Sequence, residues 1–444
     1  MIVETQDFRR MEAAMTGVTK SQAEKDLMER ARAVLPAGGF GNFTPDIVIA
    51  RGEGSRVWDV SGNEYVDYLL GSGPMVIGHA HPEVVEAVTA QLPLGSTFFA
   101  DSEPGIVLAE EICRAVPCAD KVRFVSSGSE ADMYAMRLAR AHSKREKILK
   151  FEGGYHGMSD FGLMSLAPKK LANFPQAVPD SAGIPRGVRD DVIVAPYNDT
   201  DLAVRMIAEY AGELGGVIVE PFQRLLPPKP GFLEALREAT KKHNVPLIFD
   251  EVVTGFRFAY GGAQEYYGIT PDLCTLGKVI GGGYPLAAIA GSDEIMAHFN
   301  KAQVGEEGFT FQVGTLSGNP VASVAGLKTM EILKRDDAYT KMFATGRTIM
   351  AALDEHLGRA GVAAKVVGEP PLFDVVFTDR DVHDYRGMFA GDAAMAKRFN
   401  GLLRQSGILK PESKYYIGLC HTEADVALTI DAIATAAEGL RKAA

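Results

Sequence analysis

The chain has 444 residues, of which 46% are hydrophobic and 23% charged, and its formal net charge is -11 at pH 7. This length suits two domains, or one large domain with a satellite, and the composition is that of an ordinary globular protein. The acidic balance argues against nucleic acid or an anionic membrane surface as the main partner, and no apolar run is long enough to cross a bilayer.

The N-terminal segment reads as a small α+β unit. A helix is predicted over residues 20–34, because its amphipathic pattern ends just before Pro36. Strands are predicted over 47–50, 56–58 and 65–70, with turn residues between the last two. The opening residues lack a charged start followed by an apolar core, so we expect no secretion signal and a cytoplasmic enzyme.

From about residue 80 the pattern changes to short apolar strands that alternate with helices. The predicted helices cover residues 82–91, 104–116, 130–142 and 232–243. The predicted strands cover residues 122–125, 147–151, 192–195, 216–220 and 247–250. Strand, helix and strand at this spacing indicate a mostly parallel sheet with crossover helices. Residues 167–191 carry four prolines and no clear period, which predicts a long surface loop, functional or not.

The C-terminal part returns to an α+β pattern. Its predicted helices cover residues 320–335, 388–404 and 423–441, and its predicted strands cover 365–367 and 372–377. We expect this part to pack with the N-terminal unit as one small domain. The predicted division is therefore 1–75 for the N-terminal segment and part of the small domain, 76–325 for the large domain, and 326–444 for the rest of the small domain.

The four cysteines are an ordinary set of thiols. They stand at Cys113, Cys118, Cys274 and Cys420. No Cys-x-x-Cys pair occurs and no His/Cys spacing suits zinc, so we expect buried thiols in a reducing compartment and no metal site.

Two segments point most directly to chemistry. The apolar run 245–249 ends at Asp250, and Lys278 follows in a turn rich in glycine and aliphatic residues. A carboxylate at the end of a buried strand is how open α/β sheets present polar groups to a ligand, although it also caps helices. A poorly solvated lysine is a nucleophilic amine, whereas a solvated loop lysine is not. Together they indicate a carbonyl cofactor held as an imine, with Asp250 on a ring nitrogen.

Three further segments could complete such a site. Ser127, Gly128 and Ser129 stand between a strand and a helix, where backbone N–H groups suit a phosphate, or where the serines only cap the helix. Tyr155 and His156 follow a glycine turn, so the aromatic ring lies on a planar cofactor or simply packs in the core. Glu220 ends another apolar strand as Asp250 does, with a weaker case for touching the cofactor.

A last segment, Gly314-Thr315, offers an amide and a hydroxyl before a helix and is a second candidate for a phosphate contact. In this order the motifs resemble those of the class III, fold-type I pyridoxal-phosphate aminotransferases, close to the glutamate-1-semialdehyde aminomutase branch. The likeness runs from Arg51 to the His-Thr-Glu-Ala-Asp run that begins at His421. It implies an α/β fold with a large, mostly parallel domain and a small α+β domain built from both termini.

The resemblance also implies roles for single residues. Pyridoxal 5'-phosphate would be the cofactor, with Lys278 as its imine-forming amine and proton carrier and Asp250 on its pyridine nitrogen. Tyr155 and Val252 would flank the ring. Gly128 and Ser129 would hold the phosphate, together with Thr315 supplied across the interface of a homodimer with shared active sites.

The chain departs from the aminomutase pattern at three places in the substrate pocket. Ser72 stands where the aminomutases carry a tryptophan, Ser413 where they carry a glutamate, and residues 40–44 replace a Ser-Pro-Val-Arg segment. A substrate carboxylate also needs a cation, for which Arg51, Arg56, Arg257 and Lys414 are candidates. These changes favour an aminotransferase that moves an amino group from an amino acid, including β-amino or aromatic ones, to a keto acid by a ping-pong mechanism.

Three alternatives remain open from the sequence. An aminomutase-type isomerase would use the same cofactor residues and need no separate amino acceptor. A nucleotide-binding oxidoreductase lacks support, because no Gly-x-Gly-x-x-Gly joins a strand to a helix. A catalytically silent scaffold would not need both Asp250 and Lys278.

Overall fold

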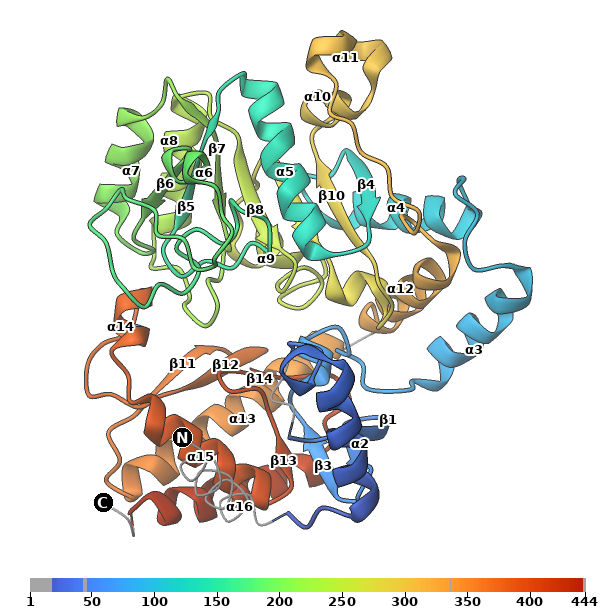
Figure 1. Ribbon diagram of the computed structural model, residues 1–444, viewed down its shortest axis with the longest axis vertical. Coiled ribbons are helices and arrows are strands. Elements are labelled where there is room, and N and C mark those ends of the chain that lie inside the picture. Colours follow the sequence, from blue (N-terminus) through green and yellow to red (C-terminus); the bar gives the residue numbers. More distant parts are fainter. Residues whose placement is uncertain (1–17, 43–45, 336, 442–444) are drawn as a thin grey trace. The chain divides into compact units, whose positions relative to one another are not determined.

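The computed structural model describes residues 18–42, 46–335 and 337–441, which fold into two compact units (Figure 1). The smaller unit combines residues up to 81 with 340–381 and 390–444, and the larger comprises 82–339 and 382–389. The larger unit was predicted to cover residues 76–325. It begins at 82 and continues to 339, and it also takes in residues 382–389. The cause at the second limit is helix α12 (Pro320–Leu333), which packs on helices α3 and α4 of the larger unit.

The larger unit is built on a seven-stranded sheet in the order β4-β10-β9-β8-β7-β5-β6. Its strands are β4 (Lys121–Val125), β5 (Lys147–Phe151), β6 (Val192–Ala195), β7 (Leu214–Val219), β8 (Leu247–Glu251), β9 (Leu273–Leu276) and β10 (Ala287–Gly291). β10 runs antiparallel to both neighbours, and the other pairings are parallel. The predicted α/β class with a mostly parallel sheet is thereby confirmed.

The helices of this unit follow the crossover pattern (Figure 1). They are α3 (Pro82–Gln91), α4 (Glu103–Ala115), α5 (Gly128–Ser143), α6 (Arg186–Asp190), α7 (Thr200–Glu209), α8 (Phe232–Lys242), α9 (Gly262–Tyr267), α10 (Asp293–Met296), α11 (Lys301–Gly308), α12 and α14 (Tyr385–Phe389). Single 3-10 turns lie at η3 (Leu92–Leu94), η4 (Lys278–Gly281) and η5 (Ala297–Phe299). The 167–191 segment contains α6, which the sequence did not predict.

Helix α5 forms the main core of the larger unit with the sheet. Its buried aliphatic side chains include Ala131, Ala135 and Leu138, which pack with residues of β8, β9 and β10. The same buried face also carries one acidic residue, Asp132, at 2% exposure. A carboxyl group on an apolar helix face is costly unless it has partners, so its surroundings matter for the site.

The smaller unit contains two further sheets, one ordered β1-β2-β3-β13 and the other β11-β12-β14. Their strands are β1 (Ile49–Glu53), β2 (Arg56–Asp59), β3 (Glu64–Asp67), β11 (Lys365–Glu369), β12 (Leu372–Val376), β13 (Ile408–Leu409) and β14 (Tyr415–Tyr416). The helices are α2 (Gln22–Val34), α13 (Ala338–Arg359), α15 (Ala393–Gln405) and α16 (Glu423–Arg441), with 3-10 turns η1 (Pro36–Gly38) and η2 (Leu70–Ser72). The pairing of β3 with β13 joins N-terminal and C-terminal segments, as predicted for the small domain.

The core of the smaller unit holds a buried ion pair. Lys410 donates to the carboxylate of Asp374 at 2.9 Å, and also to Asn400 Oδ1 and the Pro411 carbonyl. Burial raises the pKa of Asp374, and Lys410 opposes that rise. Over the described residues, no helix combines the length and the apolar character needed to cross a membrane.

Candidate active site

The carboxyl end of the central sheet gathers the residues that the sequence singled out. β8 ends with Asp250 and Glu251, and Asp250 is the register partner of Thr275 on the parallel strand β9. Lys278 stands three residues after Thr275, at the start of η4, and so leaves the sheet at the same edge. Asp250 and Lys278 therefore belong to neighbouring strand ends, which is where open α/β sheets bind ligands.

Lys278 has an unusual backbone. Its φ is 49°, in the left-handed region, and the residue is partly buried, between the buried Gly277 and Val279 in the chain. For a residue with a Cβ this conformation costs about 1–2 kcal/mol. Strained backbone of this kind clusters at functional sites, where it fixes the direction of a side chain.

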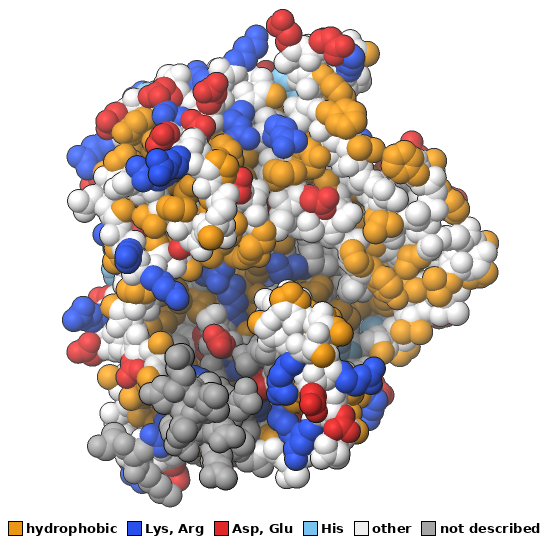
Figure 2. Space-filling model, viewed as in Figure 1, with side chains coloured by type: hydrophobic (Ala, Val, Ile, Leu, Met, Phe, Trp, Pro, Cys, Tyr) orange, Lys and Arg blue, Asp and Glu red, His pale blue; other side chains and the backbone are white. Residues whose placement is uncertain are grey.

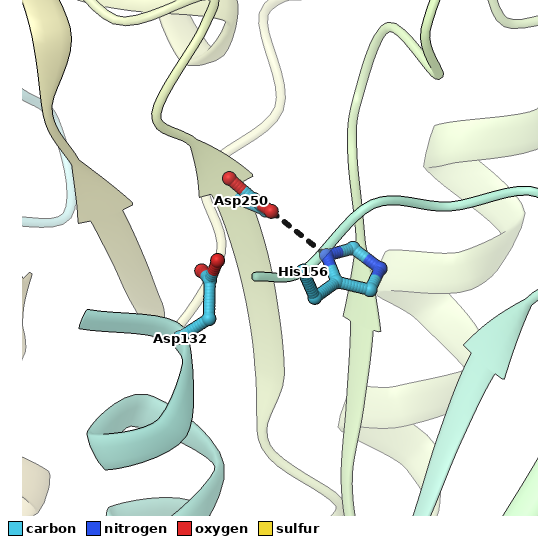
Figure 3. A group of neighbouring side chains, drawn as sticks. All are labelled: Asp132, His156 and Asp250. Atoms are coloured by element: carbon cyan, nitrogen blue, oxygen red, sulfur yellow. Dashed lines mark hydrogen bonds and ion pairs between the residues drawn. The ribbon is translucent and has the colours of Figure 1, made fainter. Parts of the chain in front are cut away.

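Asp250 is bound on both carboxylate oxygens. His156 Nδ1 donates to its Oδ2 at 2.8 Å, and the Val252 amide donates to its Oδ1 at 3.1 Å (Figure 3). Asp250 is 5% exposed and His156 is 1% exposed. The two donors fix the orientation of the carboxylate, and each places the positive end of an N–H dipole against one of its oxygens.

The loop after β5 supplies His156 and its neighbour Tyr155. The Tyr155 amide donates to Glu220 Oε2 at 2.9 Å, and Glu220 is 5% exposed at the end of β7. Burial raises the pKa of the Tyr155 hydroxyl, and Arg224 lies over its ring with 5.4 Å from the guanidinium carbon to the centroid. Glu220 thus positions the loop through its backbone, and a direct contact between Glu220 and the cofactor stays a prediction.

The start of α5 has the features expected of an anion site. Ser127 is the N-cap and shares a capping box with Glu130, which leaves Gly128 and Ser129 as the first two helical residues. The first N–H groups of a helix have no partner within the helix, and the helix dipole favours negative charge there. Ser129 Oγ also accepts from the Met158 amide at 3.2 Å, which joins this turn to the His156 loop.

Val252 is enclosed by glycines from two of these segments. A Cβ built on Gly128 would lie 2.9 Å from its Cγ1, and one built on Gly277 would lie 3.2 Å from the same atom. The valine therefore sits against both the Ser127–Ser129 turn and the residue before Lys278. The role of Val252 on one face of the cofactor ring stays a prediction.

Two polar residues of the cluster were missed from the sequence. Thr275 Oγ1 donates to Asp132 Oδ1 at 2.6 Å and lies 3.4 Å from Asp250 Oδ1. Burial and the charge of Asp250 hold the pKa of Asp132 well above its usual range. The available signal was the acidic residue in an otherwise apolar helix face, one turn after Gly128.

Asp132, His156 and Asp250 offer ligand atoms within 4.8 Å of one another, a spacing that a metal ion could also use. The phosphate-type turn and the lysine at the same edge fit a pyridoxal phosphate better. Asp250 can pair with a ring nitrogen, Tyr155 and Val252 can flank a ring, and the α5 N-terminus can hold its phosphate. His156 Nε2 is buried and has no hydrogen-bond partner among the described residues, and it lies on the side of the ring that faces away from Asp250 (Figure 3). The residues present therefore fit the cofactor.

Gly314 and Thr315 stand apart from this cluster in the described contacts. Thr315 is exposed, and the turn that follows it packs with Gly318 against Phe124 and near Gly105 of α4. Nothing in these contacts joins Thr315 to the phosphate-type turn of its own chain. A contact supplied to a second copy, as the sequence suggested, stays a prediction.

Two of the candidate cations for the substrate, Arg51 and Arg56, belong to the smaller unit and have partners there. Arg56 forms ion pairs with Glu64 at 2.6 Å and with the buried Asp425 at 2.8 Å. Arg51 lies over the Trp58 ring, with 3.5 Å from its guanidinium carbon to the centroid. Their roles toward a substrate stay predictions.

Ser72 and Ser413 also belong to the smaller unit. Ser72 ends η2 with φ at 67°, between two glycines that are also left-handed, and Ser413 is exposed in the turn before β14. The third departure, residues 40–44, falls partly outside the described residues. The tight turn at Ser72 explains part of its identity, because a small side chain suits this backbone.

Curated relatives of high similarity are aminomutases. The chain is 42% identical over 392 residues to glutamate-1-semialdehyde 2,1-aminomutase 2 of Brevibacillus brevis, covering 87% of this chain and 90% of that protein. It is 39% identical over 429 residues to the glutamate-1-semialdehyde 2,1-aminomutase of Syntrophomonas wolfei, covering 93% of this chain and 97% of that protein.

These relatives correct one prediction. The expectation that the chain is an aminotransferase acting between an amino acid and a keto acid was wrong, since its curated relatives over most of its length are aminomutases. The prediction rested on three short departures in the substrate pocket. Those departures are outweighed by the rest of the chain, and the residues around Lys278 cannot separate two reactions that use the same cofactor.

Solved structures and a family model cover most of the chain. An omega-transaminase from Sphaerobacter thermophilus superposes with a TM-score of 0.89 at 36% identity, covering 94% of this chain and 98% of that one. A glutamate-1-semialdehyde aminomutase from Pseudomonas aeruginosa gives a TM-score of 0.84 at 26% identity, covering 94% of each chain. The model of the family Aminotransferase class-III matches residues 40–426. The chain therefore belongs to the class III aminotransferase family, with the fold-type I architecture and pyridoxal 5'-phosphate as its cofactor.

Proposed function

We propose that this protein is an aminomutase of the glutamate-1-semialdehyde 2,1-aminomutase type, which moves an amino group between neighbouring carbons of one small amino aldehyde. The observation that carries the proposal is the similarity to curated aminomutases, at 42% and 39% identity over 87% and 93% of the chain. The cluster around Asp250 and Lys278 supports it, because it supplies the residues that such a reaction needs.

Lys278 is the proposed catalytic residue. When bound, pyridoxal phosphate supplies a carbonyl for amine exchange and a ring that accepts electron density. Lys278 would hold the cofactor at that carbonyl, and its amine, when free, would carry a proton between the positions of the substrate that lose and gain one. Its left-handed backbone holds the amine at the sheet edge for both tasks.

Asp250 is the proposed partner of the ring nitrogen. Its carboxylate is held by His156 Nδ1 at 2.8 Å and by the Val252 amide at 3.1 Å, so it is oriented before any ligand binds. A buried, oriented carboxylate keeps a proton on the ring nitrogen without reorganising during the reaction. Tyr155 and Val252 exclude water from the two ring faces.

The phosphate is proposed to lie at the N-terminus of α5, on the amides of Gly128 and Ser129. We propose a homodimer in which Thr315 of the partner subunit completes this contact. The exposed apolar side chains of α3, α4 and the segments next to them support an interface on this face of the larger unit (Figure 2). They are Leu92, Leu94, Phe98, Phe99, Ile106, Val107, Phe311, Val313 and Leu316, each at least 40% exposed.

The test of the reaction supplies one substrate with no second amino compound. Purified protein loaded with cofactor is given glutamate-1-semialdehyde with a ¹⁵N-labelled amino group, and the position of the label is followed by NMR. We expect continued turnover, with the amino group found on the neighbouring carbon and no keto acid required. Turnover that stops after one equivalent and resumes only when a keto acid is added would overturn the proposal.

The test of the dimer is separate. Light scattering on the wild-type protein should give twice the mass of the 47.7 kDa chain. Phe311→Asp should shift the protein toward the monomer and weaken binding of pyridoxal phosphate, because the side chain is 68% exposed and close to Thr315 in the sequence. A monomeric wild-type protein with full activity would contradict the shared site.

A further inference from the structure

Asp132 is the one acidic side chain on the buried face of α5, and the roles proposed above do not use it. It is 2% exposed and lies in the second turn of the helix, beyond the first turn where the helix dipole acts most strongly on a negative charge. Its Oδ1 accepts from Thr275 Oγ1 at 2.6 Å. Its other neighbour is the carboxyl group of Asp250, and an oxygen of each carboxyl group lies within 4.8 Å of the other.

Two buried carboxyl groups this close repel each other strongly when both are ionised, so one of them is expected to carry a proton. Asp250 has donors on both oxygens, from His156 at 2.8 Å and from the Val252 amide at 3.1 Å. Asp132 has the Thr275 hydroxyl as its close donor. The negative charge is therefore better stabilised on Asp250, and the proton belongs to Asp132.

The surrounding charges agree with this assignment. The groups that act on Asp132 come from several elements packed around α5, namely Asp250, Glu220, Lys150, Tyr155 and His156. Asp250 and Glu220 both oppose a second negative charge, and burial does so most strongly. Lys150 is the cation in the group, and burial lowers its pKa to about 7, which reduces its compensation.

We infer that Asp132 is a neutral carboxylic acid that donates a hydrogen bond to Asp250 and acts as a positioning residue for the carboxylate that pairs with the cofactor ring. Thr275 holds the acid in place from β9, and the acid faces the Asp250 carboxylate from the helix side. The bond draws charge away from the oxygen that faces the ring, so the shared proton stays on the ring nitrogen. The inference rests on the pyridoxal phosphate site and not on which amino transfer it serves.

The first test measures the proton directly. Infrared spectra of the protein, with and without pyridoxal phosphate, are compared with those of Asp132→Asn near pH 8.5, where Glu251, with a pKa raised by burial to about 7, is mostly ionised. We expect a carbonyl band of a protonated carboxylic acid that is absent from Asp132→Asn. The control Asp190→Asn removes an exposed carboxylate and should keep the band. A wild-type spectrum without that band, or a band that survives in Asp132→Asn, would overturn the inference.

The second test separates the donor from a merely structural side chain. The amide introduced by Asp132→Asn retains an N–H donor of similar shape, so this variant should bind pyridoxal phosphate within about threefold of the wild type. Asp132→Ala lacks a donor to a charged group, and its dissociation constant should rise about tenfold or more. Equal losses in the two variants would refute the donor role, and no loss in Asp132→Ala would end the positioning role. Neither readout depends on amino transfer, so the outcome is independent of the proposed reaction.

Discussion

Asp250 in the larger unit and Asp374 in the smaller unit are both buried, at 5% and 4% exposure, yet their surroundings differ. Asp374 faces the ammonium of Lys410, whose remaining hydrogens go to Asn400 and to a backbone carbonyl. Asp250 has a histidine, an amide and a neutral acid as neighbours, and within the described part of the chain its hydrogen-bond donors include no lysine or arginine.

The difference shows how a fold separates structural from functional charge. The Asp374–Lys410 pair is complete within the chain, so a ligand would add nothing to it. The Asp250 carboxylate is oriented by N–H donors and, within the described residues, pairs with no lysine or arginine, so a protonated ring nitrogen would supply a cation there. A buried carboxylate that is held in place by N–H donors but lacks a lysine or arginine partner therefore marks a candidate cofactor site.

The largest effect is expected from a substitution in the functional site, at Lys278. Lys278→Ala should lower kcat by about 10⁴-fold or more, because it removes both the amine and the proton carrier. The unfolding free energy of Lys278→Gly should rise by about 1 kcal/mol, since glycine adopts a φ of 49° without strain. Steady-state kinetics and thermal unfolding check the two parts, and residual turnover close to wild type would refute the assignment.

Breaking the structural side should affect stability and leave cofactor binding alone. Lys410→Met would leave Asp374 buried with an unpaired charge, which costs about 3–5 kcal/mol of unfolding free energy. The double variant Lys410→Met/Asp374→Leu removes both charges and should recover most of that loss. Urea unfolding measures stability and titration measures the affinity for pyridoxal phosphate. A double variant as unstable as the single one would contradict the account.

Lys150 sharpens the comparison because it is a buried lysine whose ammonium donates to the Gly162 and Met164 carbonyls. Burial lowers its pKa from 10.5 to about 7, so between those values the unfolded chain binds more protons and stability rises with pH. Relative to Lys150→Met, the wild type should gain about 2 kcal/mol between pH 7 and pH 9. Equal pH profiles for the two proteins would show that Lys150 is charged in the fold.

The smallest effect compares helix caps in the two units. Ser127 caps α5 and Asp392 caps α15, each by accepting from a backbone amide in the first turn. Either residue replaced by alanine should lower stability by about 1 kcal/mol. Only Ser127→Ala should also weaken pyridoxal phosphate binding, by a few fold, because its turn is the proposed phosphate site. Equal affinities of the two variants for pyridoxal phosphate would show that the phosphate does not bind at the start of α5.

Much of the fold could be predicted because its strands are apolar runs with clear ends. β5, β6 and β8 were found within a residue or so, and the α/β class was confirmed. β9 and β10 were missed, because a four-residue strand and an alanine-rich one carry weak strand propensity. Helix α7 was also missed, although Asp199 caps it in the usual way.

The candidate site divides in the same way. Asp250 and Lys278 were predictable because local sequence places each at a strand end. Asp132 and Thr275 were not, because their significance depends on how α5, β8 and β9 come together in space. The reaction was predicted wrongly since pocket residues were read one by one, while the chain as a whole follows the aminomutases.

The packing of Val252 between Gly128 and Gly277 has a consequence for anyone redesigning this enzyme. A methyl group added at either glycine would meet the valine at 2.9 or 3.2 Å, so the three positions share one fixed volume. Variant libraries that change these three positions independently will mostly contain proteins in which their side chains clash. Smaller residues at 252 should be paired with alanine at 128 or 277, so that side-chain volume is exchanged between positions.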